Sequence, residues 1–206
     1  MATEGFENFQ AVVTSLSAAA AAYVAWAGLS TWKKQQTWQN DHELARRLLI
    51  QTYEYRSTFG VIRSPVMFPD EMILDENELQ EIPNAWQRIT SIRRAYDRRW
   101  AIHWKADSML SATLIESEAV WGPDLKRLYG PIHKLRGELY ANILMLLDTL
   151  EPNMPSEVIA YRSQELSAQR KLIYEKSDSE SDAFQVDFAS FLNPIESYLR
   201  QKLGRP

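Results

Sequence analysis

Apolar side chains recur every three or four residues along most of this chain, the spacing that places them on one face of an α-helix. The longest stripe consists of Leu125, Leu128, Ile132, Leu135, Leu139, Ile143, Leu146 and Leu150. A second one consists of Leu44, Leu48, Thr52, Tyr55, Phe59 and Ile62. No segment shows the clear alternation of apolar and polar residues that marks a strand. The pattern predicts an all-α protein with a bundle of four to six helices.

Capping residues and helix breakers place several helix ends. One helix is expected over residues 84–105, and residues 108–121 either continue it or start the next. The Trp-Gly-Pro sequence at 121–123 should end that stretch. The Gly-Pro pair at 130–131 should kink the helix that follows. The Asn-Pro-Ile-Glu sequence near the C-terminus predicts that the last helix restarts there and covers 193–203.

The pattern divides the chain into two parts, an apolar anchor helix at 1–37 and a bundle domain at 38–206. Within the bundle, residues 63–83 hold three prolines and many acids and are expected to form an irregular loop. Residues 177–182 should form an acidic linker. The anchor helix either runs without a break into the bundle or ends before a new helix that Asn40 caps.

The anchor contains the stretch Val12–Trp32, and no formal charge lies between Glu7 and Lys33. Its 21 residues would reach ~31 Å as a helix, which matches a hydrocarbon core of ~30 Å. Only five of them are Val or Leu, whereas seven are Ala. Length therefore permits a transmembrane span, although the drive for insertion is small.

The flanks of this stretch favour one orientation in a membrane. The only charged side chains before it are those of Glu4 and Glu7, whereas Lys33 and Lys34 follow it directly. By the positive-inside rule, the N-terminus would lie outside and the bundle in the cytoplasm. Trp26 and Trp32 would lie at the cytoplasmic interface, where aromatic residues are enriched. We therefore predict a single-pass anchor. The alternative is a buried or coiled-coil-like helix of a soluble, cytoplasmic helical oligomer.

Small residues repeat at four-residue spacing in the anchor, as they do where membrane helices pack closely. These residues are Ser17, Ala18, Ala21, Ala22 and Ala25. The repeat predicts helix association through this face, unless it only reflects the abundance of alanine.

Composition excludes several kinds of chemistry. The net charge of −4 excludes a general nucleic-acid polycation, and the absence of cysteine excludes disulfides and thiolate sites. No glycine-rich phosphate-binding sequence is present. The three histidines, His42, His103 and His133, form no His-x-x-x-His pair. His103 and Asp107 could share a helix face, but a metal site would need two more ligands from elsewhere. We expect no metal, no cofactor and no identifiable small-molecule substrate.

The sequence Arg98-Arg-Trp-Ala-Ile-His103 carries the candidate catalytic pair that we single out. It resembles the Arg-x(4–6)-His motif of all-helical HEPN-type ribonucleases. That resemblance implies that Arg98 would stabilise phosphate charge and that His103 would transfer protons. Arg99 follows Arg98, where that family usually has a small polar or acidic residue. The spacing from Arg127 to His133 matches the motif equally well.

Basic and aromatic residues alternate around this motif, a mixture suited to anionic lipid or single-stranded nucleic acid. The candidate contact residues are Arg88, Arg93, Arg94, Arg99, Lys105 and Trp104. The loop at 63–83 carries six acids that could instead pair with these bases within the same molecule. Internal pairing is the favoured interpretation, lipid contact the next, and nucleic acid the least favoured.

Three segments, TWKKQQTWQNDHELARRLL, EAVWGPDLKRL and FLNPIESYLR, resemble segments of a loose group of bacterial membrane-anchored helical proteins without a known activity. The resemblance implies a bacterial inner-membrane setting and no catalytic residue. The leading hypothesis is a non-enzymatic membrane-anchored module that binds a protein partner or itself. A membrane-tethered ribonuclease or defence effector and a soluble oligomer are the alternatives.

Overall fold

The computed structural model describes residues 2–174 and 182–204, and side chains at 1–16, 18, 19 and 165–171 lie outside the described part. Within this part the protein is all-α and has no strand, as predicted. Its elements are α1 (Ala2–Arg63), the 3-10 helix η1 (Pro69–Met72), α2 (Glu76–Glu81), α3 (Asn84–Trp121), α4 (Asp124–Leu128), α5 (Gly130–Thr149), α6 (Ser156–Ile173) and α7 (Ala183–Leu203).

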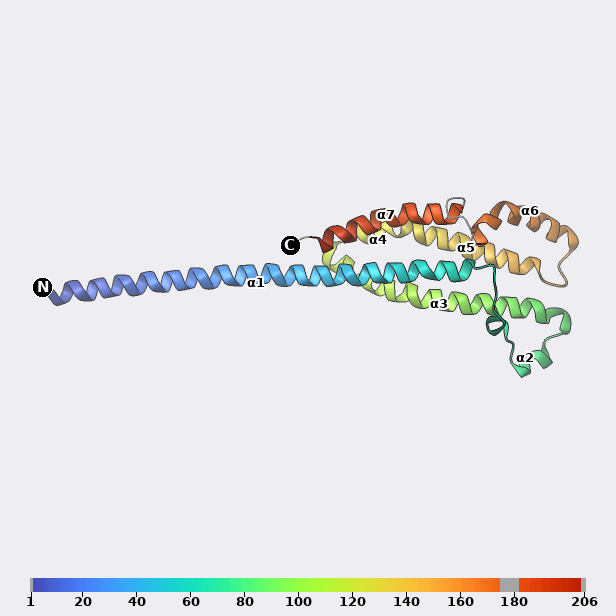
Figure 1. Ribbon diagram of the computed structural model, residues 1–206, viewed down its shortest axis with the longest axis horizontal. Helices are drawn as coiled ribbons and strands as arrows, with labels where there is room; N and C mark the ends of the chain where they lie inside the picture. Colours follow the sequence, from blue (N-terminus) through green and yellow to red (C-terminus); the bar gives the residue numbers. More distant parts are fainter. Residues whose placement is uncertain (1, 175–181, 205–206) are drawn as a thin grey trace.

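Helix α1 dominates the shape of the molecule (Figure 1). It is 62 residues long, which corresponds to ~93 Å at 1.5 Å per residue. Its second half packs against α3 and α7 in the bundle, whereas its N-terminal part extends beyond every other element. Asn40 lies inside the helix and starts no new one, and no Gly or Pro interrupts the chain between Lys34 and Gly60. The anchor and the first bundle helix are therefore one element.

The core lies between α1, α3, α5 and α7, and α6 covers the far end of α5 (Figure 1). Both apolar stripes contribute to it. All six members of the stripe in α1 are buried, and so are five of the eight members of the longer stripe, whereas Leu150 is exposed. The largest buried apolar side chains of the core include Tyr55, Phe59, Tyr96, Trp100, Tyr129, Phe184 and Phe188. The bundle thus forms around the stripes that the sequence predicts.

Two possible interruptions, one left open near residue 108 and one predicted at 193, are absent. Helix α3 continues without a break from Asn84 to Trp121. The predicted restart of the last helix is wrong, because α7 begins at Ala183 and passes through Pro194. Its start is fixed by Asp182, whose carboxylate accepts a hydrogen bond from the backbone N–H of Gln185 at 3.3 Å. A stripe from Phe184 to Leu199 remains buried on both sides of the proline, which explains why the helix continues.

The breaks at the glycines are present. Gly122 ends α3 with φ at 84°, a conformation that favours glycine. The Gly-Pro pair at 130–131 opens α5 one residue after α4 ends, so the predicted kink is a break between two helices. The acidic segment at 63–83 is largely irregular but contains η1 and α2. Asp75 caps α2 by accepting a hydrogen bond from the N–H of Glu78 at 2.8 Å.

Candidate functional site

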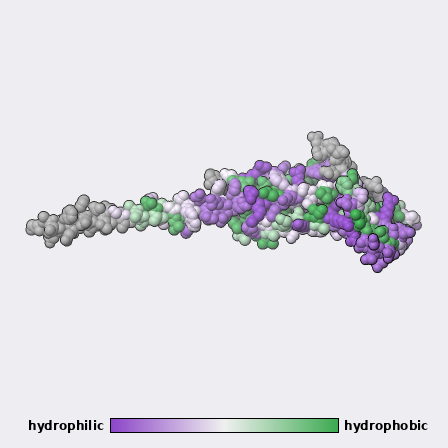
Figure 2. All heavy atoms as spheres, turned by 60° about the horizontal axis from the view of Figure 1, so that its bottom comes forward, coloured by the Kyte–Doolittle hydropathy of each residue, from purple (hydrophilic) through white to green (hydrophobic). Residues whose placement is uncertain are grey.

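The N-terminal part of α1, residues 2–37, is called the projecting segment below. Its described side chains are exposed on all sides from residue 20 to 26, including Tyr23, Val24 and Trp26, each exposed by 67% or more. Figure 2 shows this stretch as a pale and green zone between grey atoms and the polar bundle. Large apolar side chains usually gather on a buried face. The segment is therefore the most conspicuous surface of the described chain.

The residues predicted at a membrane interface lie on this segment. Trp26, Trp32, Lys33 and Lys34 are all exposed. Ser17, Ala21, Ala22 and Ala25 of the small-residue repeat are exposed as well, and the side chain of Ala18 lies outside the described part. A helix that is apolar around its whole circumference is typical of burial in a membrane or in a larger assembly.

Within the part of the chain that the structure describes, no helix is both long and apolar enough to cross a membrane. The predicted span Val12–Trp32 lies partly outside that part, because the side chains of residues 12–16, 18 and 19 are not described.

The basic face of α3 is largely engaged by its own chain. Arg99 donates to both carboxylate oxygens of Glu71 at 3.1 and 2.8 Å, and its hydrogen bond lowers the pKa of that carboxyl. Arg94 forms an ion pair with Glu78. Arg98 donates to the backbone carbonyls of Asp70 and Ile73 rather than to a carboxylate. The acidic loop therefore covers this part of the basic face.

The remaining basic candidates differ among themselves. Arg93 pairs with Glu151 at 3.1 Å, beyond the end of α5. Among the described residues, Arg88 and Lys105 have no ion-pair or hydrogen-bond partner. Trp104 is 42% exposed, and the guanidinium of Arg136 lies 5.1 Å from its ring centroid. Lipid or nucleic acid would thus find two unpaired cations here rather than a continuous basic surface.

His103 is fully buried in a cluster of aromatic rings from α1 and α3. The Thr58 hydroxyl donates to the carbonyl of Tyr55, so its oxygen accepts from Nδ1–H of His103 at 2.7 Å. Burial, followed by the charge of Arg136, lowers the pKa of His103 to about 3. The imidazole is therefore neutral near neutral pH and has no access to solvent.

Arg98 and His103 do not form one site in this geometry. They are five positions apart on α3, which is a rotation of about 140° around the helix axis. Arg98 is exposed and bound to the acidic loop, whereas His103 points into the core. A substrate phosphate at Arg98 would lie away from the imidazole that should transfer its proton.

Sequence reasoning missed two polar pairs between the helices of the bundle. The hydroxyls of Thr52 and Tyr129 lie 2.6 Å apart, and Arg136 donates to Asp107 at 2.6 Å. Burial also lowers the pKa of His133. Thr52 was already a member of an apolar stripe in the sequence. A polar residue at a core position was the one available signal for its pair with Tyr129.

In the described residues, no three His, Cys, Asp or Glu side chains are arranged to hold a metal ion. No protein-family model, curated protein or solved structure matches the chain at a significant level.

Proposed function

We propose that the protein is a non-enzymatic, membrane-anchored interaction module. The observation that supports this most is the exposure of Tyr23, Val24 and Trp26 around the whole circumference of the projecting segment. The uncharged sequence from Phe9 to Trp32 extends this apolar surface toward the N-terminus. The proposal rests on the composition of the full stretch, because the described residues alone contain no helix that is long and apolar enough for a span.

In the proposed arrangement, Lys33 and Lys34 lie on the cytoplasmic side and the bundle begins about one helical turn beyond them. Such a weakly apolar span gains stability when it packs against a second helix. The small residues Ala21, Ala22 and Ala25 allow close approach of that helix. The partner is a second copy of the chain or another membrane protein.

Carbonate extraction and protease protection of the full-length protein test the anchor. A lysine at the centre of a span costs about 2.5–3.5 kcal/mol, so Val24→Lys should release the protein from membranes. Ala141→Lys introduces the same charge on the exposed face of α5 and should leave the protein in the membrane fraction. Recovery of the wild type in the soluble fraction without detergent would contradict the anchor and favour a soluble oligomer.

Association through the small-residue face is tested separately by cross-linking in detergent. Ala21→Leu and Ala25→Leu keep the segment apolar but hold neighbouring helices apart. We expect both variants to remain in the membrane fraction and to lose cross-linked dimer. Unchanged cross-linking would contradict packing through this face but would not contradict the membrane anchor.

A further inference from the structure

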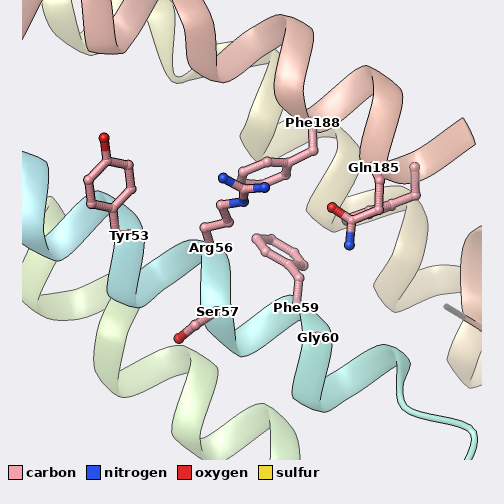
Figure 3. Close-up of a pocket in the computed structure, with 8 residues that line it drawn as sticks. Tyr53, Arg56, Ser57, Phe59, Gly60, Gln185 and Phe188 are labelled. Carbon is pink, nitrogen blue, oxygen red and sulfur yellow. The ribbon is translucent and has the colours of Figure 1, made fainter. Parts of the chain in front are cut away.

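Within the bundle, α1 carries a second stripe of side chains, on its surface rather than in the core. Its positions are spaced alternately by three and four residues, and they are Arg47, Ile50, Glu54, Ser57 and Val61. This spacing places side chains on one face of a helix, as along the seam of a coiled coil. Ser57 points away from α7, toward which Arg56 extends (Figure 3). Ile50 and Val61 are exposed by 45% and 40%, so a partner can contact both.

Helix α3 carries a matching stripe beside the first one. Its positions follow the same spacing and are all exposed, namely Arg98, Ile102, Lys105, Met109, Ala112 and Glu116. Glu116 forms an ion pair with Arg47, so the two stripes border one another. Ile102 and Met109 are exposed by 54% and 47%. The two stripes together are called the outer face below, and exposed apolar surface of this kind marks interaction sites.

The outer face also holds an acid and a base at similar heights along the bundle. Helices α1 and α3 run antiparallel, and Thr58 contacts His103 at 2.7 Å (Figure 1). Glu54 lies one turn before Thr58, and Lys105 lies two residues after His103. Among the described residues, neither Glu54 nor Lys105 has an ion pair or a side-chain hydrogen bond. The outer face therefore offers one unpaired charge of each sign.

The stripe of α1 lies on the same side of this helix as the small residues of the projecting segment. Ala25 and Val61 are 36 residues apart, which is about ten turns of 3.6 residues, and Ala21 and Ser57 have the same separation. Because α1 is one unbroken helix, a partner that packs against Ala21 and Ala25 lies on the side of the outer face.

We propose that a second copy of the chain covers the outer face in a parallel dimer. A two-fold axis parallel to α1 places α1 of each copy against α3 of the other. The same rotation brings Glu54 of each copy to Lys105 of the other, so opposite charges meet twice. The outer face mixes apolar and charged residues, so it adds to the pairing of the projecting segments. The inference thus rests on the proposed self-association of the anchor.

Disulfide formation tests which surfaces meet. The chain has no cysteine, so introduced cysteines report proximity without background. Full-length Val61→Cys and Ile102→Cys, with tags of different size, are co-expressed and oxidised mildly in detergent. The mixed disulfide dimer should form, because the dimer places these two positions at the same height. Val61→Cys with Ala141→Cys, on the exposed face of α5, should give about tenfold less of it. Equal yields would overturn the proposal.

Charge reversal tests the pairing of Glu54 with Lys105. Glu54→Lys and Lys105→Glu each place like charges opposite one another in their own dimer. Each should raise the dimer dissociation constant about tenfold, measured by ultracentrifugation of the full-length protein in detergent. An equimolar mixture of the two variants should dimerise as the wild type does, because their heterodimer again pairs opposite charges twice. Wild-type dissociation constants in the single variants would overturn the proposal, and so would a mixture that fails to recover.

Membrane fractionation of the same variants separates this inference from the proposed function. All of them should stay in the membrane fraction and keep the circular dichroism of the wild type. Loss of the mixed disulfide with normal membrane retention would overturn the parallel dimer alone, whereas release of the wild type from membranes would overturn the proposed function.

Discussion

The guanidinium of Arg63 contacts both carboxylate oxygens of Asp182 at 2.9 Å, and neither side chain is exposed. Arg63 is the last residue of α1, and Asp182 directly precedes α7. Arg63 also donates to the carbonyls of Leu172 and Tyr174, at 2.7 and 3.0 Å. One side chain thereby joins the ends of three helices.

Removal of this guanidinium should strongly destabilise the bundle. Arg63→Met leaves the Asp182 carboxylate and two carbonyls buried without their donor, so the free energy of unfolding should fall by about 3–5 kcal/mol. Chemical denaturation measures the loss. Arg46→Met removes an arginine whose ion pair with Glu43 is exposed, and it should leave stability nearly unchanged. Equal effects of the two variants would contradict the structural role of Arg63.

Acid should destabilise the protein through His103. Because burial lowers the pKa of His103 to about 3, the unfolded chain binds this proton at a higher pH than the folded one. Its contribution to stability is complete above about pH 6.5 and is lost as the pH falls toward 3, by up to about 1.4 kcal/mol per pH unit. Denaturation at a series of pH values should show this slope, and His103→Gln should reduce it. If the pH dependence of the free energy of unfolding is unchanged in His103→Gln, groups other than His103 cause the acid destabilisation.

Substitution by alanine should change the stability of the protein in opposite directions at Gly137 and Gly122. Gly137 lies inside α5 with open space around its Cβ position, so Gly137→Ala should stabilise the protein by up to about 1 kcal/mol. Gly122 has a positive φ of 84°, so Gly122→Ala should destabilise it by about 1 kcal/mol or more. Thermal unfolding of both variants measures the difference. Destabilisation by Gly137→Ala would show that the helix surface there is covered.

The ribonuclease hypothesis predicts that Arg98→Ala and His103→Ala both abolish RNA cleavage. From the geometry we expect instead no cleavage of single-stranded RNA by the wild type. Arg98→Ala should leave the fold intact, because this side chain is exposed. His103→Ala should destabilise it by about 2 kcal/mol or more, because a buried ring is lost. Cleavage that disappears in Arg98→Ala would restore the hypothesis.

The sequence was informative where one local pattern decides the structure. The stripes of α1 and α5, the stop at Gly122 and the acidic loop all follow from apolar spacing and helix breakers. Local signals failed where distant packing outweighs them. Asn193-Pro194 looks like a helix start, yet burial of Leu192 and Ile195 on either side holds α7 together. Charge alone could suggest that the acidic loop pairs with the basic helix. It could not identify Glu71 as the partner of Arg99, because the two residues are 28 positions apart in the chain.

Because α1 is continuous, it fixes the rotation of the bundle around the helix axis relative to the projecting segment. Each residue added to an α-helix turns everything beyond it by about 100° and shifts it by about 1.5 Å. One alanine inserted after Lys34 would therefore rotate the bundle by about 100° around the helix axis, whereas an insertion of seven would restore its setting to within about 20°. If partner binding alternates with insertion length, α1 acts as a rigid rod that sets the orientation of the bundle rather than as a flexible tether.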